Sequence, residues 1–198
     1  MKYPSVLEII SERQLRIFTL RDMLALLPLP LGTLSQQLAR LSEKKLLIKL
    51  KRGVWLNAAL RNWIHPYEAV PYLCAPYPAY VSLHSALNFH GLLEQVPTAT
   101  YAISAGKTAT TTTLQGQYRI HHLQAKHIWG YTQPPSMPQV LMAEPEKALL
   151  DSAYLQLRAG KNIALFPELD LSLLNKTKLT AMLKRFGDER LSHYLKNI

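Results

Sequence analysis

The sequence predicts an α+β protein, and three observations lead to this fold class. Apolar residues recur at helical spacing through about the first 45 positions, a strand-like alternation follows at once, and beyond residue 80 short strand patterns mix with helical ones. The chain has 198 residues, which allows one large domain or two small ones. Its hydrophobic content of 48% is that of a globular protein with a substantial core.

Three helices are predicted in the first third of the chain. Their apolar positions are Val6, Ile9, Ile10 and Ile17 in the first helix and Leu34, Leu38 and Leu41 in the third. The second helix begins at the N-cap Thr19, because Asp22 three residues later completes a capping box, and it ends near Pro28. The third helix follows the turn PLPLG and begins around Thr33.

After residue 45 the period of the pattern changes. Leu46, Ile48 and Leu50 alternate with Leu47, Lys49 and Lys51, which is strand spacing. Gly53 allows a tight turn, and the residues VWL return as a short strand in which Trp55 is expected to pack against the second domain or the linker tyrosines. Three helices followed by a basic hairpin predict a winged helix-turn-helix over residues 1–64.

Prolines separate this region from the rest of the chain. The segment HPYEAVPYLCAPYP holds four prolines and predicts a linker over residues 65–80. Residues 81–198 are expected to form a mixed α+β domain. Its predicted elements are the helix SLHSALNFHGLLEQ with Ser82 as N-cap, the strands TYAIS, QYRIHHL and VLMA, a helix from Pro145 to Gly160, helices over 176–186 and 189–196, and a hairpin arm or exposed loop at TATTTT.

The charge of the chain is basic and uneven. The net charge is +10 and the pI is near 9.7, and residues 1–65 hold 11 basic against 4 acidic residues, a net +7. Such an excess indicates a polyanionic partner, either nucleic acid or an anionic membrane surface. The longest apolar run, MLALLPLPL, is nine residues with two prolines, too short and broken to cross a bilayer.

Compartment can be inferred from the termini and from cysteine usage. Glu8 and Glu12 stand where a signal peptide would be apolar, so no secretion signal is expected. The single cysteine, Cys74, cannot form an internal disulfide, which favours a reducing compartment. We therefore expect a cytoplasmic protein with no membrane partner.

The third helix and the hairpin carry the candidate DNA contacts. Glutamine pairs bidentately with adenine and arginine with guanine, so Gln36, Gln37 and Arg40, expected to face outward, suit the major groove. Hydroxyls at the helix start suit a phosphate, and the basic side chains of the hairpin would reach phosphates or the minor groove. The full set is Thr33, Ser35, Gln36, Gln37, Arg40, Lys44, Lys49, Lys51 and Arg52. The alternative is a solvated helix face and an edge hairpin guarded by charge.

Catalytic and metal-binding patterns are not found in the sequence. His84 and His90 lie about 120° apart on a helix and cannot share a ligand face. No zinc-ligand spacing or phosphate-binding glycine loop occurs. Glu144 and Glu146 open a helix, where the dipole favours acids, so capping explains them better than a nuclease site with Asp151. We expect no enzyme, metal or cofactor.

Several segments together resemble AbiEi-type antitoxins, bacterial regulators of type IV toxin–antitoxin systems in phage defence. They are RLSEKKLLIKLKRGVWL, YVSLHSALNFHGLLEQVP, TYAIS, GQYRIHHL and MAEPEKALLD, in the order and spacing of that family, and they span roughly residues 3 to 155. The resemblance implies an N-terminal DNA-binding domain that represses its own operon. It also implies a C-terminal domain needed for antitoxicity, which assists cooperative DNA binding, and a nucleotidyltransferase-like toxin as partner.

One residue departs from the family pattern. Lys45 stands where the family often has a glycine after the third helix. A non-glycine residue in a left-handed cap costs about 1–2 kcal/mol, so the helix either ends differently here or continues further.

Two functions follow from these observations. The leading hypothesis is a sequence-specific repressor and antitoxin that binds the double-stranded DNA of its own promoter as a monomer or a homodimer. The alternative is a protein-interaction module that neutralises a toxin by direct binding, with DNA binding incidental. A metal-dependent nuclease using Glu146 and Asp151 is a third hypothesis, for which no residue spacing argues.

Overall fold

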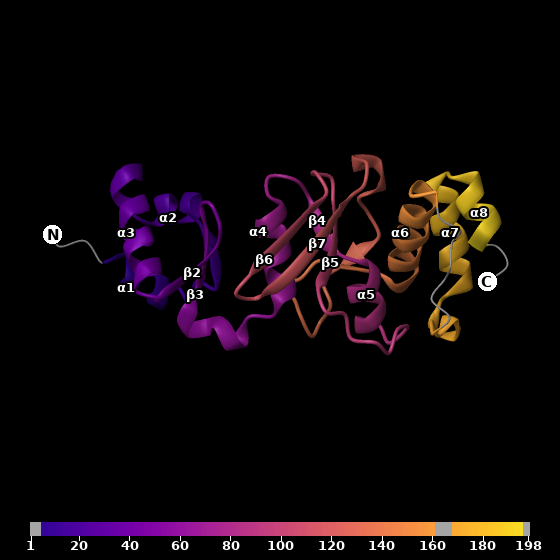
Figure 1. Cartoon of the computed structure of the whole chain (residues 1–198), viewed down its shortest axis with the longest axis horizontal. Helices are drawn as coiled ribbons and strands as arrows, with labels where there is room; N and C mark the ends of the chain where they lie inside the picture. The colour runs from indigo at the N-terminus through magenta and orange to yellow at the C-terminus, as the bar shows by residue number, and fades with distance from the viewer. Residues whose placement is uncertain (1–4, 161–167, 196–198) are drawn as a thin grey trace. The chain divides into compact units, whose positions relative to one another are not determined.

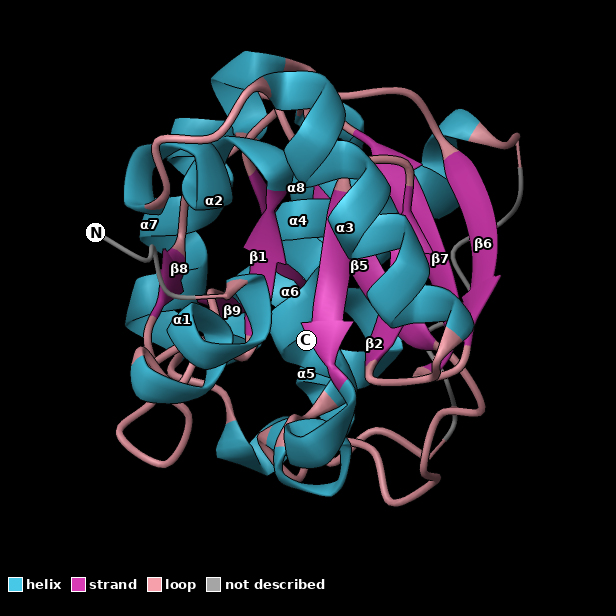
Figure 2. Cartoon of the chain, turned by 90° about the vertical axis from the view of Figure 1, so that its left-hand side faces the viewer, coloured by secondary structure: helices cyan, strands magenta, loops and turns pink. Residues whose placement is uncertain are grey.

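The computed structural model describes residues 5–160 and 168–195, and its architecture is mixed α+β (Figures 1 and 2). The chain divides into two compact units. The N-terminal unit runs to Ala75 and includes the turn Thr112–Gly116, and the C-terminal unit comprises Pro76–Thr111 and the chain from Gln117 onward. The predicted fold class is therefore confirmed at the level of α+β.

The N-terminal unit alternates helices with short strands. Its elements before the proline-rich segment are α1 (Val6–Glu12), β1 (Ile17–Thr19), α2 (Leu20–Leu26), α3 (Leu31–Glu43), β2 (Leu47–Lys51), β3 (Val54–Asn57) and the 3-10 helix η1 (Ala58–Trp63). The capping box of Thr19 and Asp22 is confirmed at the start of α2. Ile17 was expected in the first helix, but Gln14 adopts a left-handed φ of 47° just after α1, so Ile17 lies in β1 instead. β3 is the central strand of an antiparallel sheet with the order β1-β3-β2.

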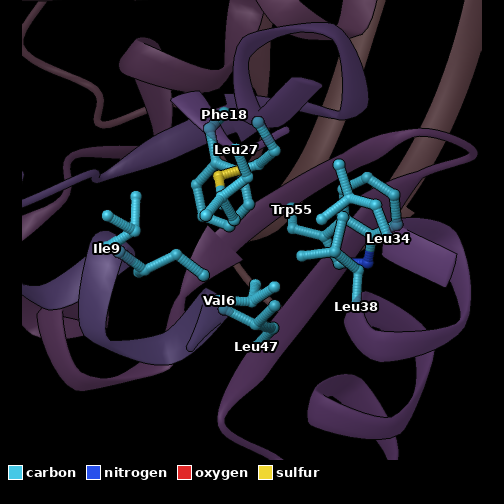
Figure 3. Close-up of a cluster of buried hydrophobic side chains, with 10 residues drawn as sticks. Val6, Ile9, Phe18, Leu27, Leu34, Leu38, Leu47 and Trp55 are labelled. Atoms are coloured by element: carbon cyan, nitrogen blue, oxygen red, sulfur yellow. The ribbon is translucent and has the colours of Figure 1, made fainter. Parts of the chain in front are cut away.

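The core of this unit draws on helices α1, α2 and α3 and on the sheet (Figure 3). Its buried members are Val6, Ile9, Ile10, Phe18, Met23, Leu27, Leu34, Leu38, Leu47 and Trp55. The Trp55 ring stacks on Phe18 with the ring centroids 6.4 Å apart. The expectation that Trp55 packs against a second domain or the linker tyrosines is wrong, because β3 is the middle strand and turns this side chain into the core of its own unit.

The turn from α3 to β2 is closed by a left-handed residue. The N–H of Leu46 donates to the carbonyl of Leu41 and the N–H of Lys45 donates to the carbonyl of Ser42, each at 3.0 Å, which is the Schellman pattern. Lys45 has a φ of 59°. The departure from glycine noted in the sequence therefore falls on a position that adopts the strained conformation, and α3 ends here rather than continuing.

This turn also changes which residue is buried at the start of the hairpin. Leu46 was expected to face the core, but as the residue after the left-handed cap it is 41% exposed. Leu47 is buried in its place, Ile48 and Leu50 are buried as expected, and Gly53, with a φ of 78°, makes the predicted turn into β3.

The proline-rich segment 65–80 is structured rather than an irregular linker. It holds the 3-10 helix η2 (Pro66–Ala69), the helix α4 (Val70–Cys74) and the start of strand β4 (Ala79–Val81). The guanidinium of Arg16 binds both carboxylate oxygens of Glu68, at 2.7 and 2.8 Å, and this contact raises the pKa of Arg16. Proline sits within the first two positions of both helices, where its missing N–H costs nothing.

The C-terminal unit is a six-stranded sheet with helices. Its elements are β4, α5 (Leu83–Phe89), β5 (Thr100–Ser104), β6 (Ala109–Thr113), β7 (Gly116–His122), η3 (Ala125–His127), β8 (Tyr131–Thr132), β9 (Met142–Ala143), α6 (Pro145–Arg158), η4 (Leu171–Leu173), α7 (Lys176–Phe186) and α8 (Glu189–Leu195). The sheet order is β6-β7-β5-β4-β9-β8. α6 packs against α5, α7 and α8 (Figure 1). Each predicted helix and strand occurs here, but α5 ends at Phe89, six residues before the predicted end, and β9 covers only the last two residues of VLMA. TATTTT forms β6, and position 196 of the last predicted helix lies outside the described residues.

A buried ion pair joins α6 to the central strand β4. Lys147 and Asp151 lie one helical turn apart on α6, and both side chains are fully buried and bonded to each other. The ammonium of Lys147 also donates to the Tyr80 hydroxyl at 2.9 Å, and that hydroxyl donates to Asp151 at 2.9 Å. Ser82 donates to the same carboxylate oxygen at 2.8 Å. Burial lowers the pKa of Lys147 and raises that of Asp151, so the charged pair depends on this complete set of partners.

Neighbouring backbone accommodates this network. The Lys147 stem lies against Gly130, where an added Cβ would come within 3.0–3.2 Å of it, and its ammonium lies 5.0 Å from the centre of the Trp129 ring. Ser82 is the N-cap residue of α5, as predicted, but its hydroxyl binds Asp151 rather than the helix. The next residue, Leu83, is buried with a φ of 55°, an uncommon conformation for a bulky side chain.

The Lys45 turn yields a stability prediction. Lys45→Gly should raise the free energy of unfolding by about 1 kcal/mol, because glycine adopts a positive φ without the clash of a Cβ. Urea denaturation measures the change. Lys44→Gly is the matched control: Lys44 has a φ of −75°, so glycine there should lower stability. Equal effects of the two substitutions would contradict the assignment of strain to Lys45.

The buried pair yields a second prediction. Lys147→Met should lower the free energy of unfolding by about 3–5 kcal/mol, because it leaves a buried carboxylate without its cation. The double variant Lys147→Met with Asp151→Leu should regain much of that loss. Chemical denaturation of the parent, the two single variants Lys147→Met and Asp151→Leu, and the double variant forms a thermodynamic cycle, and strictly additive effects would contradict the coupling.

Candidate nucleic-acid interface

Helix α3 separates a buried face from a polar one. Leu34 and Leu38 are fully buried, and at 100° per residue Gln36 lies on the opposite side. Arg40 follows Gln36 by one turn, and both side chains are exposed. The outward face of α3 thus presents an amide and a guanidinium next to each other.

A groove separates α3 from the β2–β3 hairpin. It has a volume of about 970 Å³ and is lined by Leu20, Leu31, Gly32, Ser35, Ala39, Ser42, Glu43, Lys49, Arg52, Gly53 and Trp55. Small and hydroxyl side chains form its helix wall, and Lys49 and Arg52 supply cations from the hairpin wall. Glu43 is the one acid in this lining. The groove therefore brings together three of the residues that the sequence selected, Ser35, Lys49 and Arg52.

The basic side chains at this face remain available to a ligand. Among the described residues, Arg40, Lys49 and Arg52 form no ion pair, and all three are exposed. An exposed and unpaired cation keeps its full attraction for an anion, since no carboxylate competes for it.

Lys51 has a different environment from the one expected. It was predicted to face DNA, but its ammonium donates to the carbonyls of Leu73 at 3.0 Å and Ala75 at 3.2 Å. These carbonyls lie at the C-terminal end of α4, where a helix favours a cation. Lys51 thus holds α4 to the hairpin, and it is the predicted contact that the structure does not place with the others.

The remaining predicted contacts lie beside the groove. α3 begins at Leu31, two residues before the predicted start, so exposed Thr33 is the third helical residue and not its cap. Gln37 is half-buried on the flank nearer the core, and exposed Lys44 follows the helix as its C-cap. These three residues border the outward face without lining the groove.

The histidines have partners within the protein. His90 bonds the carbonyl of Ala143 at 2.8 Å, His122 bonds that of Gly106 at 2.8 Å, and His127 stacks on Phe186. Over residues 5–160 and 168–195, no group of three His, Cys, Asp or Glu side chains has the arrangement of a metal site. In the same ranges no helix has both the length and the apolarity needed to cross a bilayer.

The three carboxylates considered for a nuclease site all bind groups within the protein. Asp151 is fully buried in its pair with Lys147. Glu144 binds Lys178 at 2.8 Å, and Glu146, 3% exposed, accepts from the backbone N–H of Asn175 at 2.9 Å. These contacts tie α6 to the start of α7.

Two features of the C-terminal unit escaped the sequence reasoning. The buried pair was marked by a lysine and an aspartate four residues apart within the otherwise apolar stretch KALLD, a spacing that places them on one helix face. The exposed cluster around Arg119 left only one signal in the sequence, the alternation of polar and apolar residues in QYRIHH. That alternation does not show which side chains of the neighbouring strand lie beside Arg119.

Comparison with known proteins gives no assignment: no protein-family model matches the chain, and no curated protein is similar in sequence. The site must be interpreted from its own residues.

The two hairpin lysines should behave differently when truncated. Lys51→Ala should lower the free energy of unfolding by about 1 kcal/mol, because two carbonyls lose a charged donor. Lys49→Ala is the matched control on the same strand and should stay within about 0.5 kcal/mol of the parent, since its side chain is exposed. Thermal or urea denaturation measures both, and a reversed order would contradict the anchoring role of Lys51.

Proposed function

We propose that the chain is a sequence-specific DNA-binding repressor and the antitoxin of a type IV toxin–antitoxin system. In this proposal the N-terminal unit is a winged helix-turn-helix, α3 is its recognition helix, and the β2–β3 hairpin is its wing. The observation that carries the proposal is the groove between α3 and the hairpin, with cations on one wall and the polar face of α3 beside it.

The order of elements supports the winged-helix assignment. Helix α2 leads through a short turn into α3, and the chain then forms a hairpin whose second strand pairs with β1. Buried Leu34 and Leu38 fix α3 to the unit through one face, so the other face is free to enter a major groove. The +7 charge of residues 1–65 supports a duplex as partner.

The chemistry of this surface divides into two tasks. Gln36 and Arg40 carry the bidentate donors that distinguish adenine and guanine from other bases. Ser35, Lys49 and Arg52 line the groove, where one phosphate strand would lie, and contacts of this kind fix register without reading sequence. Lys51, engaged by α4, has no part in this proposal.

The antitoxin function rests on the resemblance of five segments to AbiEi-type antitoxins. The proposed target is the promoter of the chain's own operon, and the proposed functional partner is a nucleotidyltransferase-like toxin. Expression of the adjacent gene, with and without this chain, tests that part: growth arrest that co-expression relieves supports it, and a harmless neighbour argues against it.

DNA binding has a direct test. In a fluorescence anisotropy titration with the duplex upstream of its own gene, Gln36→Ala with Arg40→Ala should weaken specific binding on the order of 100-fold, since each bidentate base contact contributes about 1–3 kcal/mol. Lys49→Ala should weaken all duplexes alike and reduce the slope of log affinity against log salt by about 1.

Arg13→Ala provides the control for loss of charge, because Arg13 is an exposed arginine of the same unit that does not line the groove. It should change specific binding little. Binding that is absent at low salt, or that the double substitution leaves intact, would overturn the proposal.

A further inference from the structure

A second ordered cluster of cationic and aromatic side chains lies on the sheet of the C-terminal unit. Strands β5 and β7 are parallel neighbours, and their register sets Tyr101 opposite Arg119 and Ile103 opposite His121. Alternation along β7 buries Tyr118 on the other face and leaves Arg119 exposed. Arg119, His121 and Tyr101 therefore share one face of the sheet.

The side chains of this cluster hold one another in place. The Arg119 guanidinium lies 5.6 Å from the centre of the Tyr101 ring and donates to the Tyr101 hydroxyl at 3.2 Å. The His121 ring is parallel to that of Tyr101 within 5°, with centroids 6.4 Å apart. His84, from α5, packs on Tyr101 with centroids 4.7 Å apart. Four planar groups are thus ordered before any ligand arrives, which reduces the entropy lost on binding.

The charge state of the cluster suits stacking. Burial, the neighbouring His121 and Arg119 lower the pKa of His84, and burial and Arg119 lower that of His121, so both rings are neutral at neutral pH. Arg119 is then the cation of the cluster, and among the described residues it forms no ion pair. The edge strand β6 beyond β7 carries only alanine and threonine, so no large side chain of that strand covers Arg119.

We propose that Arg119, His121, Tyr101 and His84 form a binding surface for single-stranded nucleic acid. Unpaired bases stack on the planar faces of the guanidinium and the histidine ring, and the remaining guanidinium donors bind a backbone phosphate. Aromatic residues on adjacent strands of a sheet stack unpaired bases in this way in known nucleic-acid-binding folds.

The composition of the cluster favours unpaired bases over a duplex. A duplex hides the faces of its bases and is bound through many phosphate contacts, whereas this surface has one cation and three rings. Stacking is tolerant of base identity, so little sequence preference is expected. The site does not depend on duplex binding by α3, because the residues concerned belong to different units.

The test is fluorescence anisotropy of the full chain with labelled ten-nucleotide oligouridine RNA and oligothymidine DNA. The parent should bind a single strand, and Arg119→Ala and His121→Ala should each weaken that binding about tenfold. Tyr101→Phe keeps the ring and removes the hydroxyl that orients Arg119, so its effect should be smaller. Preference for RNA over DNA identifies a contact to the 2′-hydroxyl, and equal affinity identifies stacking with phosphate contact.

Arg158→Ala is the matched control. Arg158 is an exposed arginine of the same unit whose guanidinium lies 5.9 Å from the centre of the Tyr154 ring, so it copies the Arg119 arrangement without the parallel histidine. It should leave single-strand binding unchanged. The variant Gln36→Ala with Arg40→Ala should also keep this binding, which separates failure at this site from failure of the repressor proposal.

Three results would overturn the inference. The first is a parent chain that binds neither oligonucleotide at about 100 µM, the weakest dissociation constant typical of nonspecific nucleic-acid binding. The second is an equal loss of affinity in Arg119→Ala and Arg158→Ala. The third is an unlabelled duplex that competes as well as an unlabelled single strand. Thermal denaturation of each variant accompanies the titration. If Arg119→Ala does not fold, His121→Ala alone decides the outcome.

Discussion

The buried pair of Lys147 and Asp151 is the interaction on which the C-terminal unit depends. Two opposite charges removed from water are tolerated only when every donor and acceptor has a partner. Here the partners are Tyr80 of β4 and Ser82, the residue after that strand, while Trp129 and Gly130 enclose the lysine stem. Helix α6 can satisfy this geometry in one position against the sheet, so the pair specifies how the helix and the strand meet.

This constraint has visible consequences in the surrounding backbone. Ser82 gives its hydroxyl to Asp151, so α5 begins without a side-chain cap. Leu83 follows in a left-handed conformation that costs about 1–2 kcal/mol in an L-residue. The chain thus accepts a helix without a side-chain cap and a strained residue where a buried carboxylate needs hydrogen-bond donors. An unpaired buried charge costs more free energy than either a missing cap or a left-handed residue.

The N-terminal unit depends on backbone geometry at a turn. The left-handed Lys45 reverses the chain between α3 and β2 and so sets the distance between α3 and the hairpin. The groove that carries the proposed function exists because of this reversal. Its helix wall includes small and hydroxyl residues, and its cations come from β2 and from the hairpin turn that follows it.

The sequence alone was sufficient to predict features that depend on interactions between residues close in the chain. The capping box of Thr19 and Asp22, the helix stop before Pro28 and the turn at Gly53 depend on neighbours within a few residues, and each was predicted. Helix periodicity also placed Gln36 and Arg40 on the outward face of α3, because burial of Leu34 and Leu38 fixes the rotation of the helix.

Tertiary structure decided what depends on partners distant in sequence. Ile17 joined a strand because β3, some forty residues away, offered it a backbone partner at Leu56. The ammonium of Lys51 is engaged because the end of α4 supplies carbonyls to it, and Tyr101 meets Arg119 because two parallel strands share a register. The sequence therefore determined the helices, the hairpin and the polar face of α3, whereas long-range pairing of charges and strands decided which side chains remain available for a ligand.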